Sequence, residues 1–216
     1  MAVLNFGLGM QEAIQFLYLV FFVYWYSKIY GMKKIISMNA LLLLFLGIIL
    51  SINASSQTLS NDDIKMQMIA DWQRAKAYTI EYLNTMPANN YSFKAVDSIR
   101  SFAQQMLHLA SGNVFLMSNA TDQQPLSWAG FELEKRPTAQ VKDSTMYYVI
   151  ASYDFCLNAV KNCDPTKWKE KKTVFGVEAT KFAFMLKAFE HQTHHRGQTT
   201  IYIRLKGIRP PEEKLF

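Results

Sequence analysis

Charge is almost absent from the first 56 residues of this 216-residue chain. Residues 40–50 read ALLLLFLGIIL, without one charged or polar side chain, and a second apolar run spans residues 13–26. The only charged residues before Ser56 are Glu12, Lys28, Lys33 and Lys34. The overall hydrophobic content of 50% therefore averages two different parts of the chain. That composition still excludes a disordered chain, a collagen-like repeat and a disulfide-dense scaffold.

Residues 32–56 have the three parts of a secretory signal peptide. The letters MKK supply a basic start, an apolar run follows, and SINASS closes the segment with small and polar residues. Cleavage before Gln57 would place Ala54 and Ser56 at the −3 and −1 positions, where small residues are typical. We therefore expect a signal peptide over residues 32–56. Residues 1–31 are then an over-extended start that precedes the true initiation site.

The alternative keeps both apolar segments as membrane helices, with residues 1–31 holding an extra one. Residues 13–26 are short for a span, but extension to Tyr30 brings them nearer the usual length of about 20 residues. Three lysines lie in the link between the segments and would hold it in the cytoplasm. In both interpretations residues 57–216 are exported, to the periplasm or the outer side of the membrane. Only the N-terminal segment is expected to contact the membrane.

Residues 57–216 carry a net charge of +4, compared with +6 for the whole chain. A mild surplus spread over 160 residues favours solubility and does not indicate a nucleic-acid partner. The densest basic cluster lies within residues 167–172, where we expect a solvated loop or a helix start. Cys156 and Cys163 would lie about 10 Å apart on a continuous helix, so we expect both to be unpaired. They could pair only if the helix ends before Cys163.

Four segments of the exported part place apolar side chains at three- and four-residue steps, which is the spacing of amphipathic helices. They span about residues 61–86, 98–119, 141–161 and 176–206. Ser60 is a suitable N-cap for the first segment, and Gly207 ends the last. Residues 121–137 are predicted to form a long loop, and no segment is predicted to be a strand. The sequence thus predicts an all-α protein, an antiparallel four-helix bundle.

All four histidines of the chain fall within predicted helices: His108, His191, His194 and His195. His191 and His195 are one helical turn apart, so their rings lie on one face and can be offered to one metal ion. His108, in the middle of the second helix, can supply a third ligand from across the bundle. Three neutral imidazoles suit Zn²⁺, Ni²⁺ or Fe²⁺ and leave positions open for water or substrate. His194 points about 100° away from His195 and is assigned to solvent.

The histidine spacing by itself leaves a plainer explanation open. Two histidines four residues apart also arise by chance on a solvated helix face. His108 lies between Leu107 and Leu109, so it is equally well explained as a core residue with one hydrogen bond. The sequence offers no obvious fourth ligand, which favours an open site if a metal binds.

A more specific pattern lies at the end of the chain. Residues 191–198 read HQTHHRGQ, and the helix that follows ends near a glycine and a pair of prolines. A histidine also closes the run SFAQQMLH at residues 101–108, and the first helix contains Trp72. Over about residues 58–216 this pattern resembles the DinB family, also called DNA-damage-inducible or YfiT-like proteins.

The resemblance implies a four-helix bundle that holds a divalent metal ion, either zinc, nickel, iron or manganese. Carried over residue by residue, the metal ligands are His108, His191 and His195. Three further residues match the family pattern and are expected to support the site: Arg196, Gly197 and Gln198. The glycine would permit a close backbone approach, and the two polar side chains would bond neighbouring loops or the metal ligands.

The resemblance also implies an activity. Characterised relatives look like metal-dependent thiol S-transferases and maleylpyruvate isomerases that use a low-molecular-weight thiol. An open metal position can bind a thiol, lower its pKa and deliver a thiolate nucleophile, so a metal-dependent transferase or hydrolase-like enzyme is expected. The alternative is a non-catalytic envelope protein that binds a structural metal or a small ligand. Export favours that alternative, because thiol cofactors are scarce outside the cytoplasm. Related bundles often form homodimers.

Overall fold

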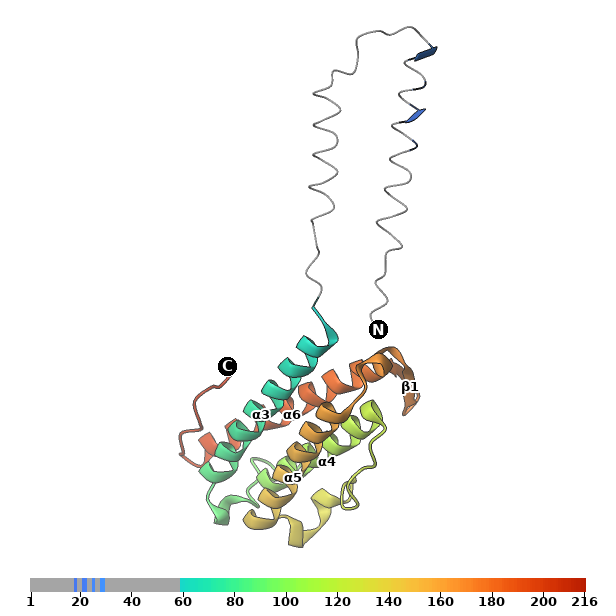
Figure 1. Ribbon diagram of the computed structural model, residues 1–216. Coiled ribbons are helices and arrows are strands. Elements are labelled where there is room, and N and C mark those ends of the chain that lie inside the picture. The colour runs from blue at the N-terminus through green and yellow to red at the C-terminus, as the bar shows by residue number, and fades with distance from the viewer. Residues whose placement is uncertain (1–17, 19–20, 23–24, 26–27, 30–58) are drawn as a thin grey trace. The chain divides into compact units, whose positions relative to one another are not determined.

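The computed structural model describes residues 18, 21–22, 25, 28–29 and 59–216. The predicted signal peptide lies outside the described residues, as does most of the segment before it. Among the residues that are described, no helix is both long enough and apolar enough to cross a membrane. Residues 59–216 form one compact unit, which is described here by itself (Figure 1).

Four long helices build this unit: α3 (Asn61–Thr85), α4 (Phe102–Thr121), α5 (Lys142–Asn162) and α6 (Lys181–Leu205). Side-chain hydrogen bonds cap the N-termini of three of these four helices. Ser60 and Ser101 each form a capping box with the residue three positions on, and the Thr180 hydroxyl accepts from the Ala183 backbone N–H at 3.1 Å. Short 3-10 turns occupy the connections: η1 (Ala88–Asn90), η2 (Leu133–Lys135), η3 (Pro137–Ala139) and η4 (Pro165–Lys169). The four predicted helices are therefore present.

A β-hairpin precedes α6, so the expectation that no strand is present is wrong. Strands β1 (Lys171–Val174) and β2 (Val177–Thr180) pair antiparallel, with Val174 opposite Val177. The two turn residues have positive φ, 51° at Phe175 and 79° at Gly176. Such angles are required in a type I′ hairpin turn and are incompatible with the helix start predicted at residue 176. Part of the predicted basic loop, Lys171 and Lys172, thus lies in a strand.

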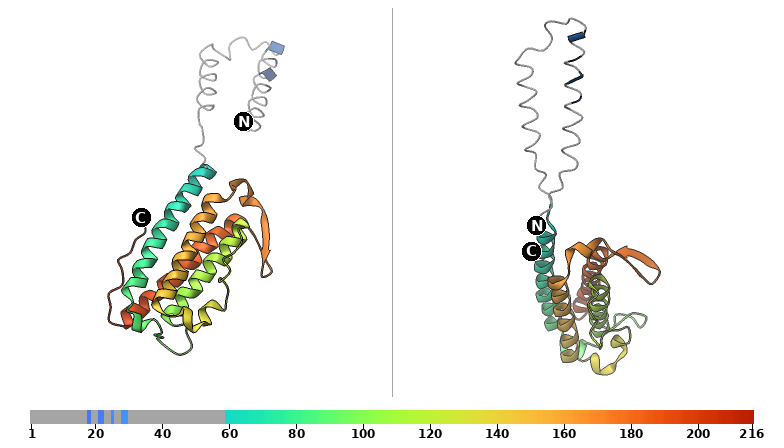
Figure 2. Two further views of the ribbon diagram at one scale, coloured as in Figure 1. Left: turned by 60° about the horizontal axis from the view of Figure 1, so that its bottom comes forward. Right: turned by 45° about the vertical axis from the view of Figure 1, so that its right-hand side comes forward.

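The helices run two in each direction (Figures 1 and 2). Antiparallel packing holds for α3 with α5, where Lys76 pairs with Asp154 at 2.5 Å, and for α4 with α6, where Lys181 pairs with Asp122 at 2.6 Å. The consecutive helices α4 and α5 instead run parallel, so the expected antiparallel order does not hold for this pair. A parallel pair requires a connection that returns along the bundle, and residues 122–141 make this crossover.

The core lies between the four helices, and each contributes a fully buried side chain: Trp72, Met106, Tyr153 and Met185. The Trp72 ring packs edge-on against Tyr153 and Phe189 at centroid distances of 5.7 and 5.4 Å. Cys156 is buried and Cys163 half-buried, and both are free thiols, as expected. Aromatic packing from α3 thus fixes α6 from one side while α4 packs on it from the other.

The N-cap of α4 gives a stability prediction. Ser101 is 2% exposed, and its hydroxyl accepts from the Gln104 backbone N–H at 3.2 Å. We expect Ser101→Ala to lower the free energy of unfolding by about 1 kcal/mol, measured by urea unfolding of the full chain. Ser98→Ala is the control, because Ser98 is exposed and should change stability by less than about 0.5 kcal/mol. Equal losses in the two variants would contradict the capping role.

Candidate metal centre

Three histidines converge between α4 and α6. One ring nitrogen from each of His108, His191 and His195 lies within 4.8 Å of the other two. The ring centroids are 4.4 Å apart for His191 and His195, 4.5 Å for His108 and His195, and 5.3 Å for His108 and His191. A cluster of this size could hold a metal ion. The structure therefore brings together the three side chains that the sequence singled out.

Helix geometry and helix packing each contribute to this convergence. His191 and His195 are one turn apart on α6, so their rings share one face. The antiparallel packing of α4 on α6 then places His108 opposite them. His194 is exposed, as expected, and bonds Gln198 on its own helix at 3.0 Å. The His194 ring packs edge-on against His195 at 4.9 Å, but it is not one of the three histidines whose ring nitrogens converge.

Gly112 makes room for His191. A Cβ atom at position 112 would lie 2.1 Å from Cε1 of the His191 ring and 2.5 Å from its Nδ1. Distances this short do not occur between non-bonded atoms, so no other residue fits here while the ring keeps its place. Gly112 follows His108 by one helical turn and lies on the same face of α4. The α4 backbone at this glycine is therefore one wall of the histidine cluster.

Two of the rings are oriented by hydrogen bonds from Nδ1 to side-chain oxygen atoms. His108 Nδ1 lies 2.7 Å from Glu134 Oε2, and His195 Nδ1 lies 2.8 Å from Gln105 Oε1. Carboxylate and amide oxygens only accept, so both histidines donate from Nδ1. In a neutral imidazole the other nitrogen, Nε2, then carries a lone pair. Both rings are held in the tautomer that can bind a metal through Nε2, as in carboxylate–histidine–metal arrangements.

Glu134 is itself held by Arg100. The Arg100 Nε–H donates to both carboxylate oxygens of Glu134, at 2.9 and 3.1 Å. Glu134 lies in η2, within the crossover that joins α4 to α5, and its side chain is 15% exposed. The Arg100 guanidinium thus makes a charge-assisted, bifurcated hydrogen bond to this carboxylate. The chain Arg100–Glu134–His108 therefore fixes one ring from outside the helix pair.

Nδ1 of His191 is buried and has no hydrogen-bond partner within the described residues. Burial lowers the pKa of His191 to about 4 and that of His195 to about 3, with smaller contributions from neighbouring histidines. Burial also lowers the pKa of His108, which Arg100 reinforces and Glu134 opposes. All three rings are therefore neutral at pH 7, which is the form that binds metal ions.

The structure places the three predicted supporting residues away from the cluster. Arg196 is buried, donates to Gln192 at 3.1 Å and lies 4.6 Å from the centre of the Tyr78 ring. Within the described residues, nothing outside the α6 backbone lies within 4 Å of a Cβ position at Gly197, so no close approach of another element is seen there. Gln198 bonds His194 rather than a ring of the cluster. Arg196 thus joins α6 to α3, Gly197 is exposed, and Gln198 is half-buried.

Sequence reasoning missed four residues that shape the cluster: Arg100, Gln105, Gly112 and Glu134. Gln105 and Gly112 carried a signal, because they share with His108 the face of α4 that meets α6. Arg100 and Glu134 carried none, since both lie outside the four long helices and are 34 residues apart in sequence.

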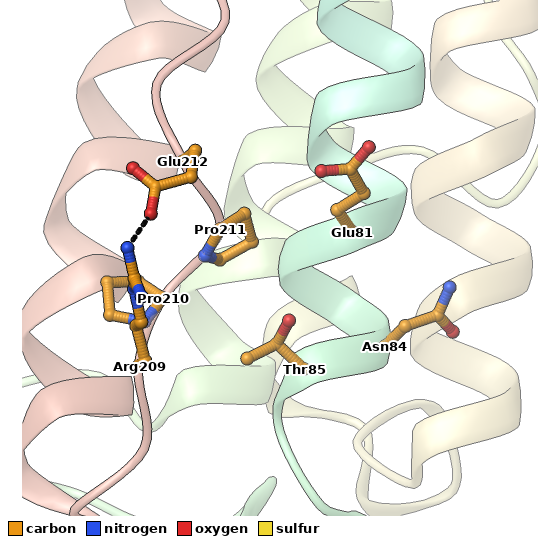
Figure 3. Close-up of a pocket in the computed structure, with 7 residues that line it drawn as sticks. All are labelled: Glu81, Asn84, Thr85, Arg209, Pro210, Pro211 and Glu212. Carbon is orange, nitrogen blue, oxygen red and sulfur yellow. Dashed lines mark hydrogen bonds and ion pairs between the residues drawn. The ribbon is translucent and has the colours of Figure 1, made fainter.

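A separate depression of about 400 Å³ lies between the end of α3 and the C-terminal tail (Figure 3). It is lined by Glu81, Asn84, Thr85, Arg209, Pro210, Pro211 and Glu212. Its one cationic group, Arg209, is paired with Glu212, and no histidine lines it. This depression therefore lacks convergent chemical groups, and the histidine cluster is the candidate site.

Replacing each of the two helical glycines near the cluster by alanine should change the free energy of unfolding in opposite directions. We expect Gly112→Ala to displace the His191 ring and to lower the free energy of unfolding by about 1–3 kcal/mol through overpacking. Gly197→Ala should raise it by about 0.5–1 kcal/mol, because alanine favours the helix and the Cβ meets no neighbour. Urea unfolding measures stability, and imidazole ¹H–¹⁵N NMR spectra report the ring. Unchanged His191 signals in Gly112→Ala would contradict the packing argument.

Comparison with known proteins agrees with this architecture. The family model of the DinB family matches residues 56–214. A crystal structure of a DinB-like protein from Bacillus cereus aligns with a TM-score of 0.59 at 15% identity, covering 68% of this chain and 95% of that one. A DinB-like protein (YjoA) from Bacillus subtilis aligns at 0.49 and 15% identity, covering 69% and 96%. A comparison with curated proteins finds no match. Because the family model spans most of the sequence, this chain belongs to the DinB family.

Proposed function

We propose that the unit of residues 57–216 binds a divalent metal ion through His108, His191 and His195 and acts as a metal-dependent transferase on a thiol. One observation carries the proposal. His108 and His195 donate from Nδ1 to Glu134 and Gln105, which leaves Nε2 of both rings with a lone pair. Neither Nε2 makes a hydrogen bond within the part of the chain that is described, so both are available to a metal ion.

The chemistry of the donor set supports the same proposal. Three neutral imidazoles are suitable ligands for zinc, nickel, iron or manganese. The buried Nδ1 of His191 costs free energy while it lacks a partner, and a metal ion bound at that nitrogen itself would offset the cost. Gly112 also leaves space for this ring that any side chain would fill. These observations support a binding centre over three incidental histidines.

Each residue has a separate role in the proposed reaction. The three histidines would hold the metal ion, which supplies Lewis-acid chemistry that lowers the pKa of a bound thiol. Glu134 and Gln105 orient two of the rings, and Arg100 holds the Glu134 carboxylate in place by hydrogen bonds. Packing of α4 against α6 shields the back of the cluster from water. Export of the unit remains part of the proposal and is supported by the signal-like segment at residues 32–56.

Metal binding by histidine variants tests the proposal. The untagged full chain, purified in detergent, should bind about one equivalent of Zn²⁺ or Co²⁺ by calorimetry and elemental analysis. His108→Ala and His191→Ala should each lower the affinity at least about 100-fold, because two ligands remain where three are needed. His194→Ala is the matched control and should bind as the parent does, since His194 is exposed and supplies none of the three converging ring nitrogens.

The same preparation distinguishes an enzyme from a structural metal site. N-acetylcysteine added to the Co²⁺-loaded chain should produce thiolate-to-cobalt charge-transfer absorption. Full metal loading without this response would favour a non-catalytic metal-binding bundle. Metal well below one equivalent in the parent, even after supplementation, would overturn the centre itself.

Glu134 provides a second test of the centre. Glu134→Gln keeps an acceptor near His108 but removes the negative charge, so we expect about tenfold weaker Zn²⁺ binding. Glu132→Gln is the matched control, because Glu132 is exposed and pairs with Lys135. Calorimetric titration of both variants compares them directly. An unchanged affinity in Glu134→Gln would mean that the carboxylate does not act on the His108 ring.

A further inference from the structure

Three phenylalanine rings from separate parts of the chain meet on the surface of the bundle. Phe115 lies on α4, Phe131 in the crossover and Phe175 at the tip of the hairpin. Phe115 stacks on Phe175 with 5.3 Å between centroids, and Phe131 lies 6.0 Å from Phe115 and 6.2 Å from Phe175. Phe131 is 59% exposed and Phe175 76%. We call these three residues the aromatic patch.

The aromatic patch continues the face of α4 that carries the histidine cluster. Phe115 follows His108 by seven residues and Gly112 by three, so all three lie along one side of the helix. The rise from His108 to Phe115 is about 10 Å, with the Gly112–His191 contact between them. On the crossover, Phe131 precedes Glu134 by three residues. This separation along α4 is comparable to the length of one small molecule.

A hydrogen bond holds the crossover in this position. The Ser111 hydroxyl donates to the Gly130 carbonyl oxygen at 2.9 Å, directly before Phe131. At the hairpin, Lys172 pairs with Asp122 at 3.0 Å and ties β1 to the end of α4. Both segments that carry patch residues are thus fixed to α4, so the rings are brought together by tertiary contacts.

The conformation of Phe175 is unfavourable for its residue type. Its φ of 51° lies in the left-handed region, where a bulky side chain is an outlier and Asn or Gly is preferred. An exposure of 76% means that burial does not offset this strain. Asparagine would suit the turn better, so the turn conformation does not explain the aromatic ring, which instead stacks on Phe115 of α4. Strain of this kind, next to a candidate site, points to a ligand.

We propose that the aromatic patch binds the flat apolar group of a small-molecule substrate whose thiol reaches the histidine cluster. This rests on the proposed metal-dependent function and names its substrate class, an aryl-bearing thiol. Stacked and edge-on rings favour a planar partner. The patch acts in recognition only, so Phe115, Phe131 and Phe175 take no part in bond making.

A matched pair of thiols tests this proposal on the Zn²⁺-loaded full chain. N-benzoylcysteine and N-acetylcysteine share the thiol and the carboxylate. They differ in the acyl substituent, which is a phenyl group in the first and a methyl group in the second. By calorimetry, the parent should bind N-benzoylcysteine about tenfold more tightly, and Phe175→Asn should reduce this preference below about threefold. Val177→Thr is the control, because Val177 is an exposed residue of the same hairpin outside the patch. Phe175→Asn should unfold at the same or a higher temperature than the parent.

A metal-free measurement separates this proposal from the metal centre. Saturation-transfer NMR of N-benzoylcysteine without added metal should show transfer to the phenyl protons that falls at least about twofold in Phe175→Asn. If the parent binds no metal, the proposed function fails, and this measurement still decides the aromatic patch. An unchanged preference or unchanged transfer in Phe175→Asn overturns the proposal. A change in oligomeric state by light scattering, without a change in thiol preference, overturns it in favour of contact between two copies.

Discussion

The close packing of α4 against α6 at Gly112 is the constraint on which the site depends. A Cβ at this position would overlap the His191 ring, so the helices reach their observed separation because the residue is glycine. That separation lets His108 approach His191 and His195 from the opposite helix. Aromatic packing of Trp72 against Phe189 fixes α6 from the α3 side. The cluster is thus a product of helix packing, and loops only complete it.

The parallel course of α4 and α5 has a functional consequence. Because these consecutive helices point the same way, the chain must return along the bundle through residues 122–141. The crossover passes the open side of α4, where it supplies Glu134 to His108 and Phe131 to the aromatic patch. A short antiparallel connection would leave the His108 ring without its carboxylate. Topology here provides the residues that orient a ring and border the site.

Electrostatics at the cluster favours neutral rings with defined tautomers. Burial keeps the imidazoles unprotonated, and oxygen acceptors on Nδ1 leave Nε2 of two rings free. Arg100 balances the charge of Glu134, so the carboxylate is not buried alone. Arg196, although it follows His195 directly, packs toward Tyr78 and Gln192 on the far side of α6. His195 and Arg196, although adjacent in sequence, therefore lie on different faces of α6, because successive residues of an α-helix are rotated by about 100°.

The sequence by itself determined the four helices and the three histidines, because amphipathic spacing and the i, i+4 relation are local properties of a helix. It also contained the DinB pattern. The hairpin was missed because its signal is a turn with positive φ at Phe175 and Gly176, which helix periodicity does not reveal. Only the tertiary structure paired Glu134 with His108, placed Gly112 under His191 and gathered the three phenylalanines. Those contacts join residues far apart along the chain, and the distances between them are set by how the helices pack.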